Sequence, residues 1–594
     1  MSVTQPESYP RGSTAIEDVR MPKLNLSPLL RRLAFLLLLL GTASALTAGH
    51  AASPASASCT GQLPCVEKTR VRIAPIPAPA EMPGQPTTLV DVPGVSVFNQ
   101  GVYIPPSAQA MMRTHQNDWG VFNRAGAAAS GFGAVGRYGA VRWAESWSAL
   151  RDPKLMQADN DPFDFLKYLP LDKSGSVYLS LSGEERLKNW FENRPGLGTI
   201  KPNDSGRMTL QSIYGADLHV GPHVRLYGEL LNAAAGGWGG YGYTAGYRTR
   251  LDLQQGFAEV TSTVLGAKSG VMLGRMEFVD APDYVLYLRT VSSVPQSWNG
   301  GRAYMIWPRV RVDLFDYIQT DITPNAMFHD RPSWGTRLYG AYSSYALPDF
   351  RLLHGAGHVF LDVFYLGTLF NGSLAAITAP TGTQAGATRR DNYGTRLWGK
   401  AGPIEFSLGA IYQGGHFSEA ATNIGRNVSA FALNESIGWR FSKNLMSPLI
   451  GVQADLYSGG NRNRKSGTIG TYTTPFVPLS SYLDTSYYTG TSNLIALSPV
   501  LEMNIGKSAV LRLKAPVLWR DNTNDAFYSP SAPYKFTSYS GGYIGTVPQA
   551  MLSLRLSRHL RWNHDVARFF ASRSLKRAGA SDATYYLSTL SFIF

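Results

Sequence analysis

The end of the chain constrains its fold more than any other part. Alternate positions of the last nine residues carry largely apolar side chains and finish on the terminal phenylalanine: Tyr586, Ser588, Leu590, Phe592 and Phe594. Alternate side chains of a β-strand point to the same face of a sheet. Transmembrane β-barrels place such an apolar stripe against lipid, and outer-membrane barrels end on a strand of this kind. The C-terminus therefore favours an outer-membrane β-barrel over a buried edge strand of a soluble β-sandwich.

The same alternation recurs from residue 176 onward, as short runs separated by Gly, Asn, Asp and Pro. The run 210–220 places Leu210 on one face and Asp217 on the other, and the turn at 221–222 leads into a second run with one polar face. We expect the polar face to line a lumen. The remaining length of about 420 residues, at about 22 to 25 residues for each strand with its turns and long outer loops, predicts an all-β antiparallel barrel of about eighteen strands. A barrel of that size encloses a water-filled channel.

Composition supports this fold class and argues against two others. The chain has 31 Tyr, 26 Phe, 12 Trp and 60 Gly, and after residue 40 it has no apolar run of about 18 residues, the length of a membrane-spanning helix. Its net charge is +14, but the basic residues are spread singly along the expected strands. No zinc-finger spacing or RNA-binding motif accompanies them. We therefore expect neither a helical membrane protein nor a nucleic-acid-binding protein.

The N-terminal part of the chain predicts export. Residues 1–52 contain Arg31-Arg32 followed by the apolar run 33–40 and then by small residues, which is the order of a cleaved secretory signal peptide. A twin-arginine signal is a weaker alternative, because the residue before the arginine pair is leucine and the core is very apolar. A signal of either kind directs the chain out of the cytoplasm, and with the barrel pattern it predicts the outer membrane of a Gram-negative cell.

Two further segments precede the barrel. Residues 53–141 are rich in Pro, Ala and Gly and predict a mostly irregular, extended periplasmic segment. It contains Cys59 and Cys65, which form a disulfide in an exported protein or remain free thiols in a flexible tail. Residues 142–175 predict a partly helical entry segment that plugs or caps one end of the barrel, and the barrel itself spans 176–594.

Eight stretches within residues 142–594 resemble the alginate export family of outer-membrane barrels, in the order found in that family. They are 142–150 and 164–171 before the barrel, 215–219, 251–257, 274–277 and 297–302 in its first half, and 490–494 and 519–526 in its second half. The resemblance implies an outer-membrane pore for alginate, a linear polyuronate with one carboxylate on each sugar.

A pore for such a polymer needs fixed positive charge, and arginine is suited to this because its planar guanidinium pairs with carboxylates and stays charged. Strand parity predicts ten inward-facing basic side chains: Arg225, Arg275, Arg309, Arg311, Arg396, Lys400, Arg512, Lys514, Arg520 and Arg555. A lipid-facing Arg or Lys near the midplane would cost about 2 to 4 kcal/mol. We expect these ten residues together to bind substrate and to make the lumen anion-selective. The alternative for each is a salt bridge with a wall carboxylate such as Asp217, Asp252 or Asp313, which would only stiffen the wall.

Together these features predict a monomeric, anion-selective pore that passively exports alginate or a related acidic polysaccharide. A substrate-specific uptake porin for small acids or oligosaccharides is the alternative, and the sequence does not separate the two. The expected partners are the anionic polysaccharide or small acidic solute, outer-membrane lipids, the barrel insertion machinery through the C-terminal strand, and periplasmic polysaccharide-export proteins. We expect no nucleic acid, cofactor or metal.

An enzymatic function is not expected. His416 and Ser418 have the His-x-Ser spacing of the outer-membrane phospholipase, in which the histidine activates the serine. The residues that follow do not continue that enzyme's motif, so no catalytic residue is assigned.

Overall fold

The structure is a computed structural model that describes residues 142–144, 147–151 and 161–594, except for gaps at 239–245, 279, 290, 308, 349, 380–381, 421–423, 442–445, 462–466, 479–481, 506–507 and 530–535. The predicted signal region 1–52, the segment 53–141 and the two cysteines, Cys59 and Cys65, lie outside the described residues.

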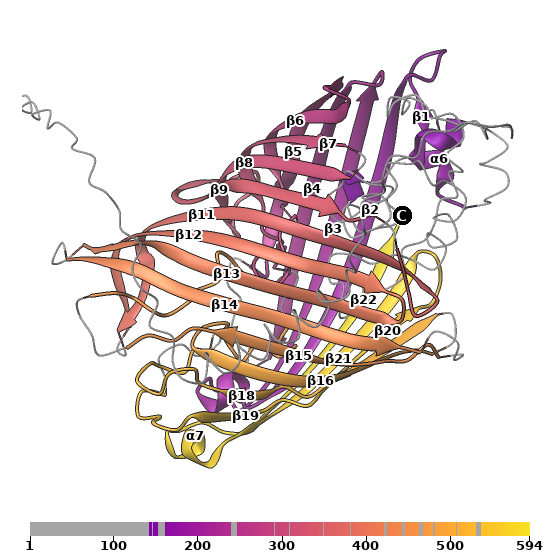
Figure 1. Ribbon diagram of the computed structural model, residues 1–594. Helices are drawn as coiled ribbons and strands as arrows, with labels where there is room; N and C mark the ends of the chain where they lie inside the picture. Colours follow the sequence, from indigo (N-terminus) through magenta and orange to yellow (C-terminus); the bar gives the residue numbers. More distant parts are fainter. Residues whose placement is uncertain are drawn as a thin grey trace, which may run out of the picture. The chain divides into compact units, whose positions relative to one another are not determined.

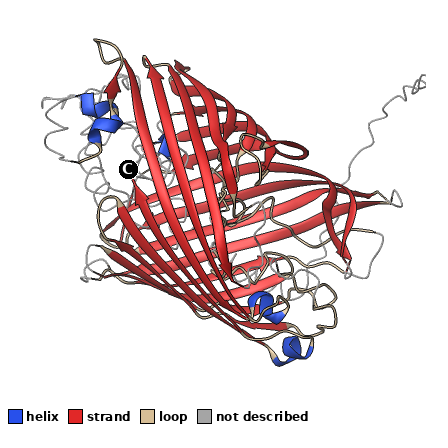
Figure 2. Ribbon diagram, turned by 180° about the vertical axis from the view of Figure 1, so that it is seen from behind, coloured by secondary structure: helices blue, strands red, loops and turns tan. Residues whose placement is uncertain are grey.

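The described strands form one antiparallel sheet that closes on itself (Figures 1 and 2). Closure occurs at β2 (Val177–Asn193), which pairs with β3 (Asp204–Val220) on one side and with the last strand, β22 (Ala583–Ile593), on the other. A closed antiparallel sheet satisfies every backbone hydrogen bond within the wall, as a membrane-spanning sheet must. The predicted all-β fold is therefore confirmed.

Twelve continuous strands complete most of the wall in chain order. They are β4 (Val224–Trp238), β5 (Thr249–Val264), β6 (Ala267–Met276), β7 (Trp298–Ile306), β8 (Val310–Asp321), β9 (Arg331–Ala346), β11 (Gly355–Ala379), β12 (Gly382–Ala401), β13 (Ile404–Glu419), β14 (Gly425–Arg440), β15 (Leu449–Tyr457) and β16 (Leu494–Ile505), before the final β21 (Leu560–Ala571) and β22.

Two more wall strands are each divided in two by a proline, which has no N–H to donate to the sheet. Pro516 separates β17 (Ala509–Lys514) from β18 (Val517–Trp519), and Pro548 separates β19 (Tyr543–Thr546) from β20 (Gln549–Arg555). The short strands β1 (Leu169–Pro170) and β10 (Phe350–Leu352) are additions at the edge of β2 and β11. Among the described residues the wall thus has eighteen strands, the predicted number.

Among the described residues, helical turns lie before the first strand and in the connections between strands, as Figure 2 shows. They are η1 (Arg142–Ala144), η2 (Ser148–Arg151), α6 (Asp164–Lys167), η3 (Pro195–Gly198) and α7 (Arg573–Arg577). Figure 1 places α6 and β1 beside the C-terminus and α7 at the opposite end of the barrel. We call these the terminal end, which has the short turns, and the loop end, which has the long connections.

The two faces of the wall differ as the alternation predicts. On β3, Leu210 and Tyr214 point outward and are 45% and 50% exposed, whereas Gln211 and Asp217 point inward and are buried. The outward stripe of β22 is also confirmed, because Tyr586 and Leu590 lie opposite the exposed residues Val566 and Trp562 of β21. An apolar outer face and a polar inner face are the arrangement of a transmembrane barrel.

Candidate functional site

Two long connections at the loop end turn into the barrel instead of extending outward from it. We call residues 277–297, between β6 and β7, the first inner loop, and 458–493, between β15 and β16, the second inner loop. Inward-facing glutamines from five strands donate to their backbone carbonyls: Gln211 to Ser293 (2.7 Å), Gln254 to Pro295 (3.2 Å), Gln413 to Thr473 (2.7 Å), Gln453 to Tyr482 (3.3 Å) and Gln549 to Leu483 (2.9 Å). The wall therefore fixes both loops inside the lumen.

The two inner loops meet each other. The rings of Tyr284 and Tyr482 lie 5.5 Å apart, and the amide of Tyr287 donates to the carbonyl of Val477 over 2.9 Å. The Tyr284 hydroxyl reaches the opposite wall at Gly409 on β13, where a Cβ atom would collide with it. The loops thus span and narrow the lumen, and this constriction, with the wall around it, is the candidate functional site.

Five of the ten predicted lumen residues form salt bridges with carboxylates. The pairs are Arg225 with Asp217 (2.6 Å) and Glu259 (3.3 Å), Arg275 with Asp252 (3.4 Å), Arg311 with Asp280 (3.0 Å) and Asp313 (2.6 Å), Arg396 with Asp362 (2.7 Å), and Arg512 with Glu502 (3.7 Å). Each of them is paired with at least one carboxylate, which is the alternative that the sequence left open for each residue.

The other five are placed differently. Arg309 lies in the turn before β8, and its guanidinium donates to the carbonyls of Ala346 and Leu347. Arg520 donates to the carbonyls of Gly541, Asp525 and Tyr539. Lys400 and Arg555 are partly exposed, opposite Glu405 and Arg561 in the strand register.

The tenth, Lys514 on β17, points to the second inner loop. Its ammonium group donates to the carbonyl of Tyr482 and, over 2.8 Å, to the side-chain oxygen of Gln453. It is 3% exposed, and no carboxylate of the described residues forms a salt bridge with it. Lys514 therefore lies at the constriction without a direct carboxylate partner among the described residues.

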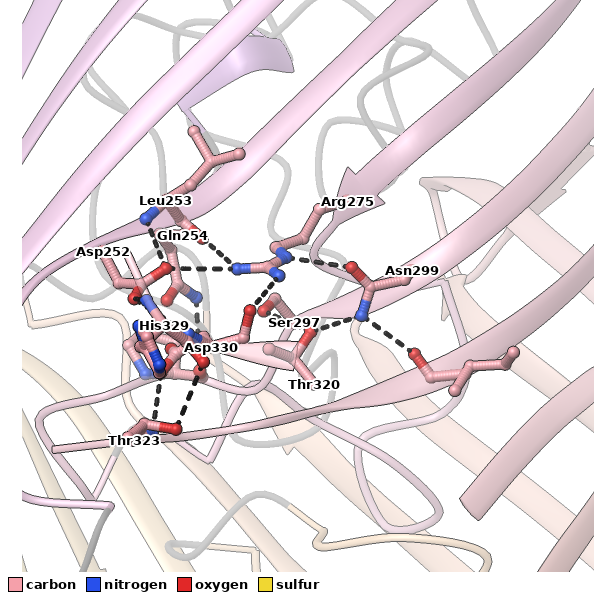
Figure 3. Close-up of polar contacts among 12 residues, drawn as sticks. Asp252, Leu253, Gln254, Arg275, Ser297, Asn299, Thr320, Thr323, His329 and Asp330 are labelled. Atoms are coloured by element: carbon pink, nitrogen blue, oxygen red, sulfur yellow. Dashed lines mark hydrogen bonds and ion pairs between the residues drawn. The ribbon is translucent and has the colours of Figure 1, made fainter. Parts of the chain in front are cut away.

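Arg275 belongs to a network at the loop end (Figure 3). Its guanidinium donates to the side chain of Asn299 (2.9 Å) and to the carbonyl of Asp330 (3.0 Å). Asp252 in turn accepts from the amides of His329 (2.7 Å) and Asp330 (3.0 Å). The network fastens the β8–β9 connection to the ends of the strands.

Parity arguments missed several arginines of the inner face, among them three that contact carboxylates or the second inner loop. Arg302 binds Asp280 and Asp313, and Arg440 binds Glu405 and Glu502. Arg390 on β12 donates to the side-chain oxygen of Gln413 and to the carbonyl of Thr471 in the second inner loop. Like Lys514, Arg390 has only uncharged hydrogen-bond acceptors among the described residues. Its position within Arg389-Arg390 gave no parity signal, because one of two adjacent arginines must face outward.

Two carboxyl groups of the first inner loop have strongly shifted pKa values. Burial raises the pKa of Asp283 to about 7, although Arg396 and Arg512 pull it down. Burial, assisted by the nearby charge of Glu229, raises the pKa of Glu277 to about 7. Both groups therefore gain negative charge near neutral pH, next to the cations of the lumen.

The family model described as alginate export matches residues 177–588, more than half of the chain. The chain belongs to the alginate export family. Because this is a family of export proteins, the match also confirms the prediction of a transport protein rather than an enzyme. No curated protein matches the chain.

Solved porin structures cover most of the same region at low identity. A BenF-like porin from Pseudomonas fluorescens Pf-5 is 11% identical, with a TM-score of 0.45, covering 70% of this chain and 99% of the porin. OpdK from Pseudomonas aeruginosa, solved with vanillate, is 12% identical, with a TM-score of 0.44, covering 70% and 98%. OccAB4 from Acinetobacter baumannii is 8% identical, with a TM-score of 0.42, covering 70% and 98%.

The described residues contain no helix long and apolar enough to cross a membrane. They contain no group of three His, Cys, Asp or Glu side chains that could hold a metal ion. His416 is exposed on the outer face, and its Nδ1 lies 3.3 Å from the side-chain oxygen of Asn427 on β14.

Proposed function

We propose that this barrel is an outer-membrane pore that passes an acidic polysaccharide, alginate or a close relative, from the periplasm to the cell surface. Membership of the alginate export family supports this substrate class. The closed barrel with an apolar outer face supports the outer membrane as its location. Export through a cleaved signal peptide, and contacts with periplasmic export proteins, are parts of the same proposal.

The observation that carries the anion preference is the pair Arg390 and Lys514. Most inward arginines are neutralised by carboxylates, so they contribute little field to the pore. Arg390 and Lys514 instead bind neutral oxygens, and both contact the second inner loop. A desolvated cation without a counter-ion attracts a passing carboxylate far more strongly than one already paired.

The test is the reversal potential of the reconstituted pore under a salt gradient. Replacing both residues, Arg390→Gln with Lys514→Gln, should lower the anion-to-cation permeability ratio by about twofold or more. The matched control, Arg337→Gln, removes a positive charge from the outer face, where Arg337 pairs with Asp316 and is half exposed. It should leave the ratio unchanged. A wild-type pore that prefers cations would refute the proposal.

A substrate-specific uptake porin for small acids or oligosaccharides is the second candidate. The contact between the two inner loops favours it, because a narrowed lumen suits a small solute better than a polymer. Uptake into liposomes separates the two functions. Passage of small organic acids with exclusion of uronate oligomers would favour uptake, whereas passage of uronate oligomers supports export.

A further inference from the structure

The described part of the entry segment begins inside the barrel, in η1. Arg142 is 7% exposed, and its Nη1 donates to Glu184 on β2 (2.7 Å), whereas its Nε donates to Glu229 on β4 (2.9 Å). The ring of Trp143, 1% exposed, meets Phe257 of β5 edge-on at 5.4 Å. Each of these wall residues faces the lumen, so η1 lies against the inner face of the first strands.

The wall binds the backbone of η1 as well as its side chains. The guanidinium of Arg225 donates to the carbonyl of Trp143 and lies over its ring, 5.6 Å from the ring centre. An ion pair to two carboxylates, an aromatic contact and a backbone hydrogen bond together define a built binding site for an arginine–aromatic segment.

A continuous path of hydrogen bonds joins this site to the first inner loop. Gln255 donates to Glu229 (3.1 Å) and accepts from the amide of Glu277 (3.1 Å), the first residue of that loop. Gln254 donates both to Glu277 (2.9 Å) and to the carbonyl of Pro295 near the loop's other end. The carboxylate that binds Arg142 therefore also helps to position both ends of the constricting loop.

The wall residues keep other partners if η1 leaves. Glu184 also accepts from Arg186 on its own strand over 2.9 Å, and Glu229 also accepts from the Tyr227 hydroxyl over 2.7 Å. The site can therefore be emptied without leaving an unpaired buried carboxylate. Farther along the chain, Phe163 packs against Phe592 and Phe594 at the terminal end, which tethers the segment to the rim.

We propose that η1 is an internal ligand of the lumen: docked at Glu184, Glu229 and Phe257, it partly closes the pore from the terminal end and stabilises the inward position of the first inner loop. The inference rests on the pore function proposed above. The site accepts a peptide segment with a guanidinium followed by an aromatic ring, and in this chain Arg142-Trp143 supplies it.

Single-channel recording of the full-length protein tests the inference. Arg142→Ala should raise the open-pore conductance by about twofold or more, because the ion pairs that hold η1 in the lumen are lost. Arg440→Ala is the matched control, since Arg440 also bridges two inward carboxylates, Glu405 and Glu502, but belongs to the wall itself. A conductance that is unchanged in Arg142→Ala, or that rises equally in both variants, would overturn the inference.

A reversible lock provides a second measurement. With Cys59 and Cys65 replaced by serine, Trp143→Cys and Phe257→Cys can be joined by a short thiol-reactive cross-linker that contains a reducible disulfide, because the two rings that they replace are in contact. The cross-linked protein should conduct poorly, and a reductant should raise its conductance. Equal conductance before and after reduction of a cross-link confirmed by mass spectrometry would contradict the inference. A complete lack of conductance in every variant, Arg142→Ala and the reduced protein included, would instead contradict the pore function.

Discussion

Arg302 binds two carboxylates from different parts of the chain, Asp280 in the first inner loop and Asp313 on the neighbouring strand β8. Its side chain is 1% exposed, and Arg311 binds the same two carboxylates. Two arginines and two aspartates thus form a closed group in which charge is balanced. Removing one arginine leaves two buried negative charges with a single partner.

We therefore expect Arg302→Ala to lower the free energy of unfolding by about 3 to 5 kcal/mol, the cost of breaking a buried ion pair. Denaturant titration in detergent, followed by the mobility of folded and unfolded barrels on gels, measures the change. The control Arg337→Ala breaks the exposed pair with Asp316 and should cost about 0 to 1 kcal/mol. Equal effects of the two substitutions would mean that the buried group contributes no more than a surface pair.

The alternation of side chains along a strand predicts the inward direction of Arg311, but it does not predict that of Arg302 or Asp280. Arg311 alternates with Val310 and Val312, so its inward direction is readable from the sequence. Arg302 follows Gly300-Gly301 on β7, where small residues give no apolar stripe. Asp280 lies in a loop, where no periodicity applies. Parity predicts a direction, but the partner of a buried charge depends on which loop folds back over it.

At the level of elements, the directions of the two inner loops could not be predicted from strand parity either. The length of the chain after residue 176 predicted about eighteen strands joined by turns and long outer loops. The described residues contain eighteen antiparallel wall strands. The inward direction of 277–297 and 458–493 does not follow from the pattern of charge, because the contacts that hold these loops come from uncharged glutamines. Inward-facing glutamines such as Gln211 and Gln413 at strand positions with polar parity are the signal that could have found them.

Two of these glutamines act as both donor and acceptor. Gln549 donates to Leu483 and accepts from the amide of Thr485, and Gln413 donates to Thr473 and accepts from its amide. Each amide group therefore pairs with loop backbone much as a neighbouring strand would. A loop that is held in this way loses several backbone partners at once when a single side chain is removed.

Gln549→Ala should therefore loosen the second inner loop while leaving the wall intact. Loss of two buried hydrogen bonds, at about 1 kcal/mol each, should speed amide exchange at Thr485 by about tenfold or more. Hydrogen–deuterium exchange with mass spectrometry measures this. In the control, Gln319→Ala, the lost amide donates to the side chain of Gln296 and to no backbone group of the second inner loop. Unchanged exchange at Thr485 in Gln549→Ala would show that packing alone holds the loop.

At the scale of the whole barrel, the lumen combines many paired charges with few unpaired ones. The chain has a net charge of +14, yet the inner face of the wall matches most arginines to carboxylates. The field that an ion meets in the pore therefore depends on the small number of groups whose charge is not balanced. Arg390 is such a cation, and Asp283 and Glu277 are carboxyl groups whose charge changes near neutral pH.

Selectivity should consequently depend on pH. The pKa of Asp283 is raised to about 7, so the group is neutral at pH 5.5 and negative at pH 8. Its negative charge offsets the nearby Arg396 and Arg512, so the anion preference should be higher at pH 5.5 than at pH 8. The difference should grow at low salt, because the Debye length rises to about 30 Å at 0.01 M. Reversal potentials measured at the two pH values test this.

Asp283→Asn should reduce the pH dependence, and Glu277 should account for part of what remains. The control Asp316→Asn, on the outer face, should preserve it, and a wild-type preference that rises with pH would contradict the assignment.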